Sequence, residues 1–405
     1  MNTPPSPAAG APPLATGAMH RAIVRADGTV RVMSRPTPRP GPGELVIATE
    51  VAGLCGTDIQ MLRGLRDDPA AVIGHEGIAR VSTTGAGTGP ELVPGALVVV
   101  NPTHPDDGSF LLGHNVDGLL QERTLVPATA VRDGLVLPLP PTTDVGLAPL
   151  LEPLAAVRYA LLALNRFIPH TLLVVGDGIV GHLAVRASSE WLGPAVRTVL
   201  VHHTRAGRAF SEASPYRADV LVDHDRMAEL RPGPGRVAVL LATPRDATVS
   251  ALEAVLAQAG DAELTVDLVG GLPAGAATPL LPGTDLVALR AANRAGRPDP
   301  MVIATVPGAA GSRVRVLGHR GVANEHLLDA AAEFERDPQR YRGLVTHDTD
   351  LDGAAAVMRT LATSRERMID GRRLVKLAVR IASPGGSLER PLTETERRTS
   401  DGRHE

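Results

Sequence analysis

The sequence predicts an α/β protein of two domains, in which a β-rich unit is followed by a doubly wound parallel sheet. The chain has 405 residues, 43% of them hydrophobic, which is enough to form two separate cores. Its first third contains short β-type runs separated by Gly, Pro and Asp residues. From about Leu150 onward, strand-like runs alternate with longer stretches rich in Ala and Leu. Such alternation is typical of parallel strands joined by crossover helices.

The β-rich unit is expected between about His20 and Pro140. Its apolar runs contain many β-branched residues and end at turn residues, which is the pattern of short strands. The expected strands are residues 44–53 (ELVIATEVAG), 76–85 (EGIARVSTTG), 96–102 (ALVVVNP) and 121–128 (QERTLVPA).

The parallel sheet is expected from six apolar runs in the second half of the chain. These runs are residues 170–178, 198–204, 219–225, 237–244, 263–270 and 313–319. After Gly318 the pattern predicts two helices, 325–337 and 351–364, and a last strand, 373–381, that returns to the first domain. Pro and Gly residues break residues 272–300 into an irregular loop and a helix.

Charge and composition exclude several classes of partner. The formal net charge is −3, no long basic run is present and 2% of the residues are aromatic, which argues against nucleic-acid binding and a polybasic membrane anchor. We therefore expect a small-molecule substrate. The single cysteine, Cys55, cannot form an internal disulfide, so a reducing compartment such as the cytoplasm is expected. No uninterrupted apolar run reaches the length of a membrane span, and residues 1–18 and 383–405 are expected to be disordered.

The stretch TLLVVGDGIVGHLAV carries the most informative local motif. An apolar run leads into Gly176, Gly178 and Gly181 at G-x-G-x-x-G spacing, and a helical pattern follows. The first glycine permits a tight turn, the second lets the backbone approach a pyrophosphate, and the third lets the helix pack close to the strand. The alternative is a glycine-rich loop without a ligand, but the strand before it and the helix after it favour a dinucleotide. The expected contacts are Gly176, Gly178, Ile179, Val180 and Gly181.

The next strand indicates which dinucleotide binds. An acidic residue near its end would bond the ribose 2′-hydroxyl and repel a 2′-phosphate. Here the strand ends VLVHHTRAGR, with His203 at the expected acidic position. Thr204 can donate a hydrogen bond, and Arg205 or Arg208 can pair with a phosphate. These residues favour NADP over NAD, the alternative being that they are solvated surface side chains.

Three side chains far apart in the sequence carry the ligand types of a catalytic zinc. Cys55 lies in GLCGTDIQ, His75 precedes Glu76 in GHEG, and Glu152 lies in LLEPLA. Thiolate, imidazole and carboxylate groups hold catalytic Zn²⁺ while leaving one position open for water or substrate. Each residue alone has an ordinary structural explanation, whereas the three together point to a metal centre.

Four motifs follow one another along the chain: Cys-Gly-Thr-Asp, Gly-His-Glu, Glu-Pro-Leu and G-x-G-x-x-G. In this order they resemble the zinc-dependent medium-chain dehydrogenase/reductase family, and within it the polyol dehydrogenases. The resemblance covers roughly residues 19–381. It implies a GroES-like catalytic domain, residues 19–153 and 320–382, around a Rossmann domain, residues 154–319, with the active site in the cleft between them.

The resemblance also implies roles for individual residues. Cys55 and His75 match the zinc ligands, and Glu152 matches the third ligand or its water-bridged substitute. Glu76 matches a glutamate that can approach the metal, so either glutamate can complete the zinc sphere. Asp58 matches the carboxylate that orients the zinc-bound histidine.

Two further residues are carried over from the family. Thr57 is expected to take the substrate proton, and Lys376 matches a basic position on the cofactor side of the cleft.

The chain also departs from the family pattern. Many members have a lobe with four cysteines that binds a structural zinc, but the corresponding residues here contain no cysteine, which excludes that second zinc. Gln60 replaces the histidine that often ends the proton relay, so protons are expected to leave through Thr57 to the ribose or to water. The cysteine-free region, residues 101–128, is the altered loop. It contains His104, His114 and Asn115, which either face the substrate or are ordinary loop residues.

These observations predict a zinc- and NAD(P)-dependent dehydrogenase that acts on a secondary alcohol or ketone of polyol, sugar or cyclitol type. One alternative is a zinc-free quinone or enoyl reductase of the same fold, and another is a non-catalytic dinucleotide-binding protein. The resemblance further implies a homodimer or homotetramer.

Overall fold

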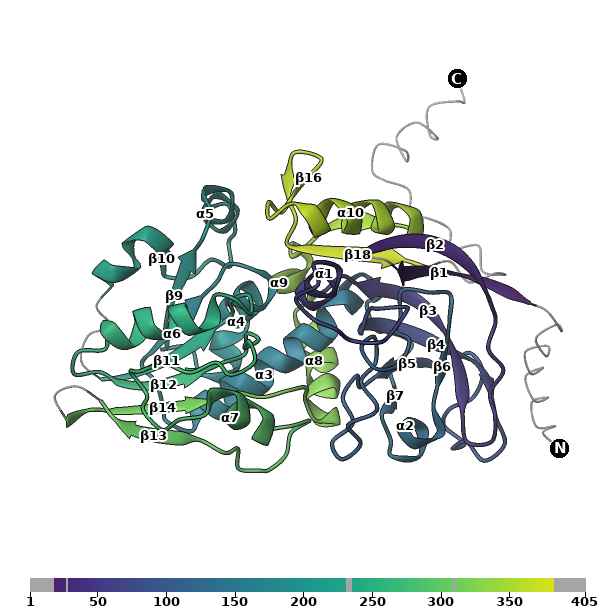
Figure 1. Ribbon diagram of the computed structural model, residues 1–405, viewed down its shortest axis with the longest axis horizontal. Helices are drawn as coiled ribbons and strands as arrows, with labels where there is room; N and C mark the ends of the chain where they lie inside the picture. Colours follow the sequence, from purple (N-terminus) through teal and green to yellow (C-terminus); the bar gives the residue numbers. More distant parts are fainter. Residues whose placement is uncertain (1–17, 27, 231–234, 309–310, 382–405) are drawn as a thin grey trace, which may run out of the picture.

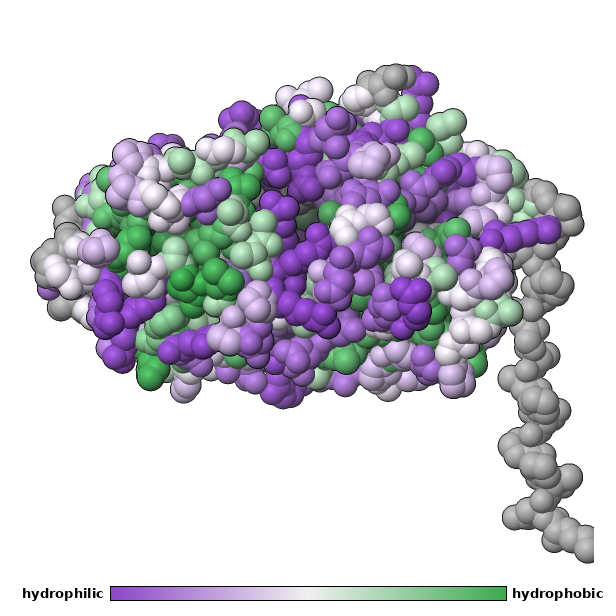
Figure 2. All heavy atoms as spheres, turned by 60° about the horizontal axis from the view of Figure 1, so that its bottom comes forward, coloured by the Kyte–Doolittle hydropathy of each residue, from purple (hydrophilic) through white to green (hydrophobic). Residues whose placement is uncertain are grey.

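The computed structural model describes residues 18–26, 28–230, 235–308 and 311–381. These residues form two halves that lie side by side, each built around its own sheet (Figure 1). On one face, hydrophilic side chains gather along the middle, where the halves meet (Figure 2). The predicted disordered leader and tail lie outside the described residues, apart from Ala18. The predicted fold class, α/β with a β-rich domain and a doubly wound, mostly parallel sheet, is confirmed.

The first half is built on a sheet in the order β15-β18-β3-β4-β5-β7, with β6 also paired to β3. Its strands are β3 (Leu45–Gly53), β4 (Glu76–Thr84), β5 (Leu97–Val100), β6 (Arg123–Val126), β7 (Val136–Pro138), β15 (Val345–Thr349) and β18 (Lys376–Arg380). Two antiparallel pairs accompany it, β1 (Met19–Ala26) with β2 (Thr29–Pro36) and β16 (Met368–Ile369) with β17 (Arg372–Arg373). The helices of this half are α1 (Gly56–Leu62), α2 (Ala128–Arg132) and α10 (Leu351–Thr363).

The sheet of the first half has an apolar core on both faces. Along β5, Leu97 and Val99 join the core shared with the central helices, whereas Val98 and Val100 join the core on the opposite side. Successive side chains of a strand point to opposite faces, so a strand covered on both sides must be apolar throughout. This explains the unbroken LVVV run of β5.

The second half is a sheet in the order β10-β9-β8-β11-β12-β14-β13, parallel except for the edge strand β13. Its strands are β8 (Thr171–Val175), β9 (Arg197–His202), β10 (Val220–Asp223), β11 (Arg236–Leu241), β12 (Glu263–Asp267), β13 (Ala304–Pro307) and β14 (Arg313–Leu317). Its helical segments are α4 (Ile179–Trp191), α5 (Arg205–Glu212), η2 (His224–Glu229), α6 (Thr248–Ala257) and α7 (Leu286–Ala292). The chain leaves β8 toward β9 on one side and returns to β11 on the other. Such a switch point is where ligands of doubly wound sheets bind.

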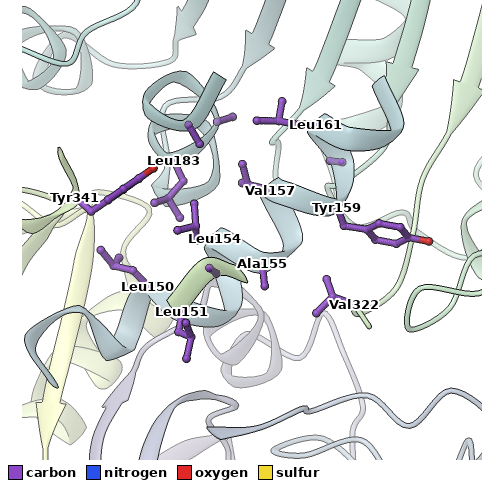
Figure 3. Close-up of a cluster of buried hydrophobic side chains, with 14 of the residues drawn as sticks. Leu150, Leu151, Leu154, Ala155, Val157, Tyr159, Leu161, Leu183, Val322 and Tyr341 are labelled. Atoms are coloured by element: carbon purple, nitrogen blue, oxygen red, sulfur yellow. The ribbon is translucent and has the colours of Figure 1, made fainter. Parts of the chain in front are cut away.

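A central group of helices joins the two halves. It comprises η1 (Val145–Leu150), α3 (Leu151–Asn165), α8 (Asn324–Arg336) and α9 (Pro338–Arg342). In Figure 3 the α3 residue Leu154 lies beside Leu183 of α4, and Tyr341 of α9 lies on the same side of α3. In the described part of the chain, the continuous helix Val145–Asn165 has the length and hydropathy to cross a membrane, but 78% of its apolar window is buried in the protein.

The last strand returns to the first half, as predicted, because β18 pairs antiparallel with β3. This pairing places residues near 376 beside residues near 53. The proposed domain limits at residues 154 and 319 stay a prediction; the first falls inside α3, and the second lies just after β14.

The buried His182 on α4 predicts a loss of stability in acid. Burial, together with the charge of Arg186, lowers the pKa of His182 to about 3, and its ring packs against Phe210 at 5.0 Å. An unfolded histidine titrates near pH 6.5, so below that pH the unfolded state binds a proton that the folded state does not. Between pH 7.5 and 5.5 we expect the free energy of unfolding of wild type to fall by about 1.4 kcal/mol more than that of the His182→Leu variant. Urea unfolding at the two pH values measures this difference, and equal losses would contradict the assignment.

Candidate metal centre and dinucleotide site

Two neighbouring strand ends bring the proposed metal ligands together. β3 and β4 are antiparallel, and Gly53 pairs with Glu76. Cys55 lies two residues beyond this pair and His75 directly precedes it, at the junction between the halves where α1 begins (Figure 1). The ligand atoms of Cys55, His75 and Glu76 all lie within 4.8 Å of one another. A sulfur, an imidazole nitrogen and a carboxylate oxygen form a donor set that fits zinc.

Asp58 supports this cluster from the first turn of α1. One carboxylate oxygen accepts a hydrogen bond from the Cys55 N–H at 2.9 Å, so that Cys55 and Asp58 form a capping box. The other oxygen lies 3.9 Å from Nδ1 of His75, and both atoms are buried without a hydrogen-bond partner. Carboxylates orient metal-binding histidines by accepting a hydrogen bond from the ring, and this oxygen lies beside the ring but beyond hydrogen-bond distance. The structure therefore brings Asp58 close to Cys55 and His75, two of the expected ligands.

The charges around the cluster favour a cation. Burial opposes protonation of His75, but Cys55, Asp58 and Glu152 outweigh it and raise the pKa of His75 to about 10. Burial raises the pKa of Asp58 and, separately, that of Glu152. Acidic groups that are buried together are stabilised by a bound metal ion.

Glu152 lies in the first turn of α3 and is half-buried. Its charge affects the pKa of His75, yet it does not belong to the close group of ligand atoms found among the described residues, which contains Glu76 instead. The role of Glu152 as a zinc ligand stays a prediction.

Lys376 contacts Glu76. Its ammonium group forms a short ion pair with Oε2 of Glu76 and donates to the backbone oxygen of Leu54 at 3.4 Å. Both side chains of the ion pair are almost fully buried, and they pack so tightly against Gly53 that a Cβ there would lie 2.9 Å from each. These contacts place Lys376 beside the metal cluster, and the cofactor contact expected of it stays a prediction.

Thr57, the expected proton acceptor, is half-buried beside the cluster. Its hydroxyl accepts a hydrogen bond from the Cys55 thiol at 3.4 Å. Gln60 follows on the same helix and is also half-buried.

The glycine motif has the geometry that a dinucleotide requires. Gly176 has a positive φ of 118°, and a Cβ there would lie 2.4 Å from the backbone oxygen of Ala242. A Cβ on Gly181 would lie 1.9 Å from the backbone oxygen of Gly176, so the helix can approach the strand only without a side chain. Gly178, in contrast, has open space where its Cβ would be. These are the three separate reasons for glycine in a dinucleotide loop.

α4 begins directly after Gly178 without a side-chain cap. The residues Ile179, Val180 and Gly181 form its first turn. Uncapped amides at a helix N-terminus, together with the helix dipole, attract phosphate.

Beyond β9, the residues expected to bind the ribose or its 2′-phosphate differ in whether their side chains are already paired or are exposed. Arg208 forms ion pairs with Glu212 at 2.8 Å and Asp223 at 3.0 Å, so its charge is already paired. His203 and Arg205 are exposed.

Thr204 caps α5, because its hydroxyl accepts a hydrogen bond from Gly207 N–H at 3.0 Å.

Arg373 is a residue of this site that sequence reasoning missed. It donates to Thr204 Oγ1 at 2.9 Å and to the backbone oxygen of Asp177 at 2.9 Å, and it forms an ion pair with the Asp177 carboxylate at 3.0 Å. Arg373, which belongs to the first half of the molecule, thus links the glycine loop to Thr204, one of the residues expected near the ribose. A signal was present in the stretch RMIDGRR, because Asp370-Gly371 with positive φ at both residues is a hairpin turn, which pairs Arg373 with Met368.

The residues of the altered loop have different roles. The His104 ring is fixed by Asp133 at 2.8 Å and by two backbone amides, which makes it a structural residue of the loop. Asn115 donates to a backbone oxygen at the exposed surface. His114, in contrast, lies against the metal cluster, with its ring centre 5.0 Å from that of His75.

Comparisons with known proteins agree with this architecture. Residues 41–139 match the alcohol dehydrogenase GroES-like domain. An uncharacterized zinc-type alcohol dehydrogenase-like protein of Haemophilus influenzae is 26% identical over 178 residues, which are 40% of this chain and 51% of that protein. Glucose 1-dehydrogenase of Thermoproteus tenax is 28% identical over 174 residues, 38% of this chain and 50% of that protein. The chain thus matches about half the length of these relatives.

Structural similarity extends over most of the molecule. A zinc-binding dehydrogenase of Sinorhizobium meliloti, solved with bound NADP, superposes with a TM-score of 0.65 at 21% identity. The superposition covers 90% of this chain and 99% of that one. Residues 41–139 thus match an alcohol dehydrogenase GroES-like domain, the chain is similar to zinc-type alcohol dehydrogenases over part of its length, and the molecule as a whole has the fold of the Sinorhizobium meliloti dehydrogenase.

Proposed function

We propose that the protein is a zinc- and NAD(P)-dependent dehydrogenase that interconverts a secondary alcohol and a ketone of polyol, sugar or cyclitol type. The observation that carries this proposal is the convergence of Cys55, His75 and Glu76 within 4.8 Å at the junction with a dinucleotide-type sheet. Similar proteins with sugar and polyol activities, such as glucose 1-dehydrogenase and the sorbitol dehydrogenase of Gallus gallus, support the substrate class.

A single zinc would be held by Cys55 and His75, with Glu76 or Glu152 as the carboxylate. Zinc held there supplies Lewis-acid chemistry that stabilises the negative charge developing on the substrate oxygen. Asp58 keeps the His75 ring oriented, while Lys376 holds the Glu76 carboxylate in place.

Proton transfer and cofactor positioning depend on the chain's own groups. Thr57 takes the substrate proton and passes it to the cofactor ribose or to water, because Gln60 cannot act as a relay base. The glycine loop and the first turn of α4 fix the dinucleotide, so that the hydride moves between groups already held together.

The preferred cofactor is NADP. No acidic residue stands at the end of β9, and His203 and Arg205 are exposed there. Because Arg208 is paired with Glu212 and Asp223, Arg205 is the arginine that would bind the 2′-phosphate. We further propose a homodimer or homotetramer.

Metal analysis and turnover assays test the proposed function. Protein purified without chelator is expected to contain about one zinc per chain, because the described donor set forms one catalytic site. It is expected to reduce NADP faster than NAD when polyols and cyclitols are screened as substrates. Zinc-free protein that reduces quinones or enoyl substrates would favour the zinc-free alternative. Zinc-free protein that binds the dinucleotide without turnover would favour a non-catalytic role.

A further inference from the structure

Two arginines follow parallel strands of the dinucleotide half and lie at the carboxyl-terminal edge of its sheet. Arg245 comes after β11 and Arg320 after β14, so both are near the carboxyl ends of their strands. Ligands of doubly wound sheets bind at this edge. The place of these arginines in the sheet therefore makes them candidates for contact with a ligand.

A third arginine approaches from the catalytic half. Arg66, on the loop between α1 and β4, has a guanidinium nitrogen 3.4 Å from Nδ1 of His114. The His114 ring in turn lies 5.0 Å from the ring of His75. Arg66 is thus separated from the metal cluster by one side chain.

Arg245 lies within electrostatic range of both Arg66 and Arg320. Burial lowers the pKa of Arg245, and the charges of Arg66 and Arg320 lower it further. Burial likewise lowers the pKa of Arg320, again with a contribution from Arg66. Because each guanidinium is within electrostatic range of the others, their positive charges meet in one region beside His114.

The charge of Arg290 also falls within this region, and the nearby negative charges are Asp68 and the buried Asp267. Asp68 is bonded to Arg66 at 2.7 and 3.2 Å, so it already has a partner. Among the residues that the structure describes, neither Arg245 nor Arg320 forms an ion pair or a side-chain hydrogen bond, and Nε of Arg245 is buried without an acceptor. Arg320 is exposed, whereas Arg245 is partly buried, and an unpaired guanidinium that is partly buried is costly unless a ligand supplies the acceptor.

The cofactor phosphates do not account for these arginines. The pyrophosphate is expected at the loop after β8, and a 2′-phosphate at the residues after β9. Arg245 and Arg320 follow β11 and β14, on the other side of the switch point between β8 and β11. Neither arginine therefore lies at an expected phosphate contact of the cofactor.

We propose that Arg245 and Arg320, with Arg66 beside them, bind an anionic group of the substrate. The substrate is then a secondary alcohol that also carries a phosphate or a carboxylate. This inference rests on the proposed function, in which the alcohol loses a hydride to NADP⁺ and a proton to Thr57. The arginines fix the distant end of the molecule while His114 separates them from the metal cluster.

The test compares three matched substrates: a hexitol, its monophosphate ester and the corresponding aldonate. For wild type we expect kcat/KM to be about tenfold to a hundredfold higher for an anionic substrate than for the hexitol, as charge-assisted hydrogen bonds allow. In the Arg245→Gln/Arg320→Gln double variant this ratio is expected to fall to near one. The Arg226→Gln variant, which changes an exposed arginine paired with Glu229 in the same half, is expected to keep the wild-type ratio. The aldonate and the phosphate ester distinguish a carboxylate from a phosphate site.

A binding experiment gives a second readout that does not depend on turnover. Titration calorimetry with inorganic phosphate, at saturating NADP⁺, is expected to detect binding to wild type and to the Arg205→Gln variant, but not to the double variant. Zinc-containing enzyme that turns over the hexitol and its phosphate equally, or wild type that binds no phosphate, would overturn the anion site and leave the proposed function intact. Protein without zinc and without turnover of any substrate would overturn the proposed function, and the phosphate titration would then decide the anion site by itself.

Discussion

Replacement of Cys55 by serine is expected to reduce zinc content to background and turnover by more than a hundredfold. Cys55 supplies the sulfur of the three-residue cluster, and a serine hydroxyl is a poor zinc ligand. Even loss of a residue that only orients a zinc ligand costs about tenfold to a hundredfold in affinity or activity, so loss of a ligand exceeds that range. Zinc content per chain and kcat/KM for the best polyol substrate measure the two effects.

Serine is the informative substitution at this position because it preserves the local structure. Cys55 is the N-cap of α1, and serine is among the best N-cap residues. An unchanged circular dichroism spectrum would show that the variant is folded. The His170→Gln variant, which removes an exposed histidine, is expected to keep its zinc and so excludes adventitious binding at the surface. A Cys55→Ser enzyme that retains turnover would refute the metal mechanism.

The fold was predictable because its signals are local. The alternation of apolar runs and helices after Leu150 predicts the parallel strands, and the glycine motif marks the switch point between β8 and β11. The short strand β15 escaped prediction, since VTHDT has no apolar alternation and is held in the sheet by its pairing with β18. Tertiary pairing of this kind overrides weak local preference.

The candidate site was predictable only in part. The ligand types of Cys55, His75 and Glu76 were recognisable in the sequence, and the antiparallel pairing of β3 with β4 brings them together. The contacts of Arg373 with Asp177 and of Lys376 with Glu76 join residues 196 and 300 positions apart. No local pattern encodes such pairs, because they depend on the return of the chain to the first half.

Replacement of Lys376 by methionine is expected to lower the free energy of unfolding by about 3–5 kcal/mol, because it leaves the Glu76 carboxylate buried without its partner. Methionine retains most of the apolar stem, so the loss reflects the missing charge more than a cavity. Urea unfolding of zinc-depleted protein measures the change without compensation by the metal.

Two control variants separate the effect of this buried charge from a general effect of substitution in the sheet. The Lys376→Met/Glu76→Gln double variant is expected to recover part of the stability, because no unpaired charge is left in the interior. The Arg80→Met variant, which breaks a half-exposed pair with Glu50 in the same sheet, is expected to lose no more than about 1 kcal/mol. If Lys376→Met unfolds at the same urea concentration as wild type, the ammonium group does not stabilise Glu76, and the carboxylate is free to approach the metal.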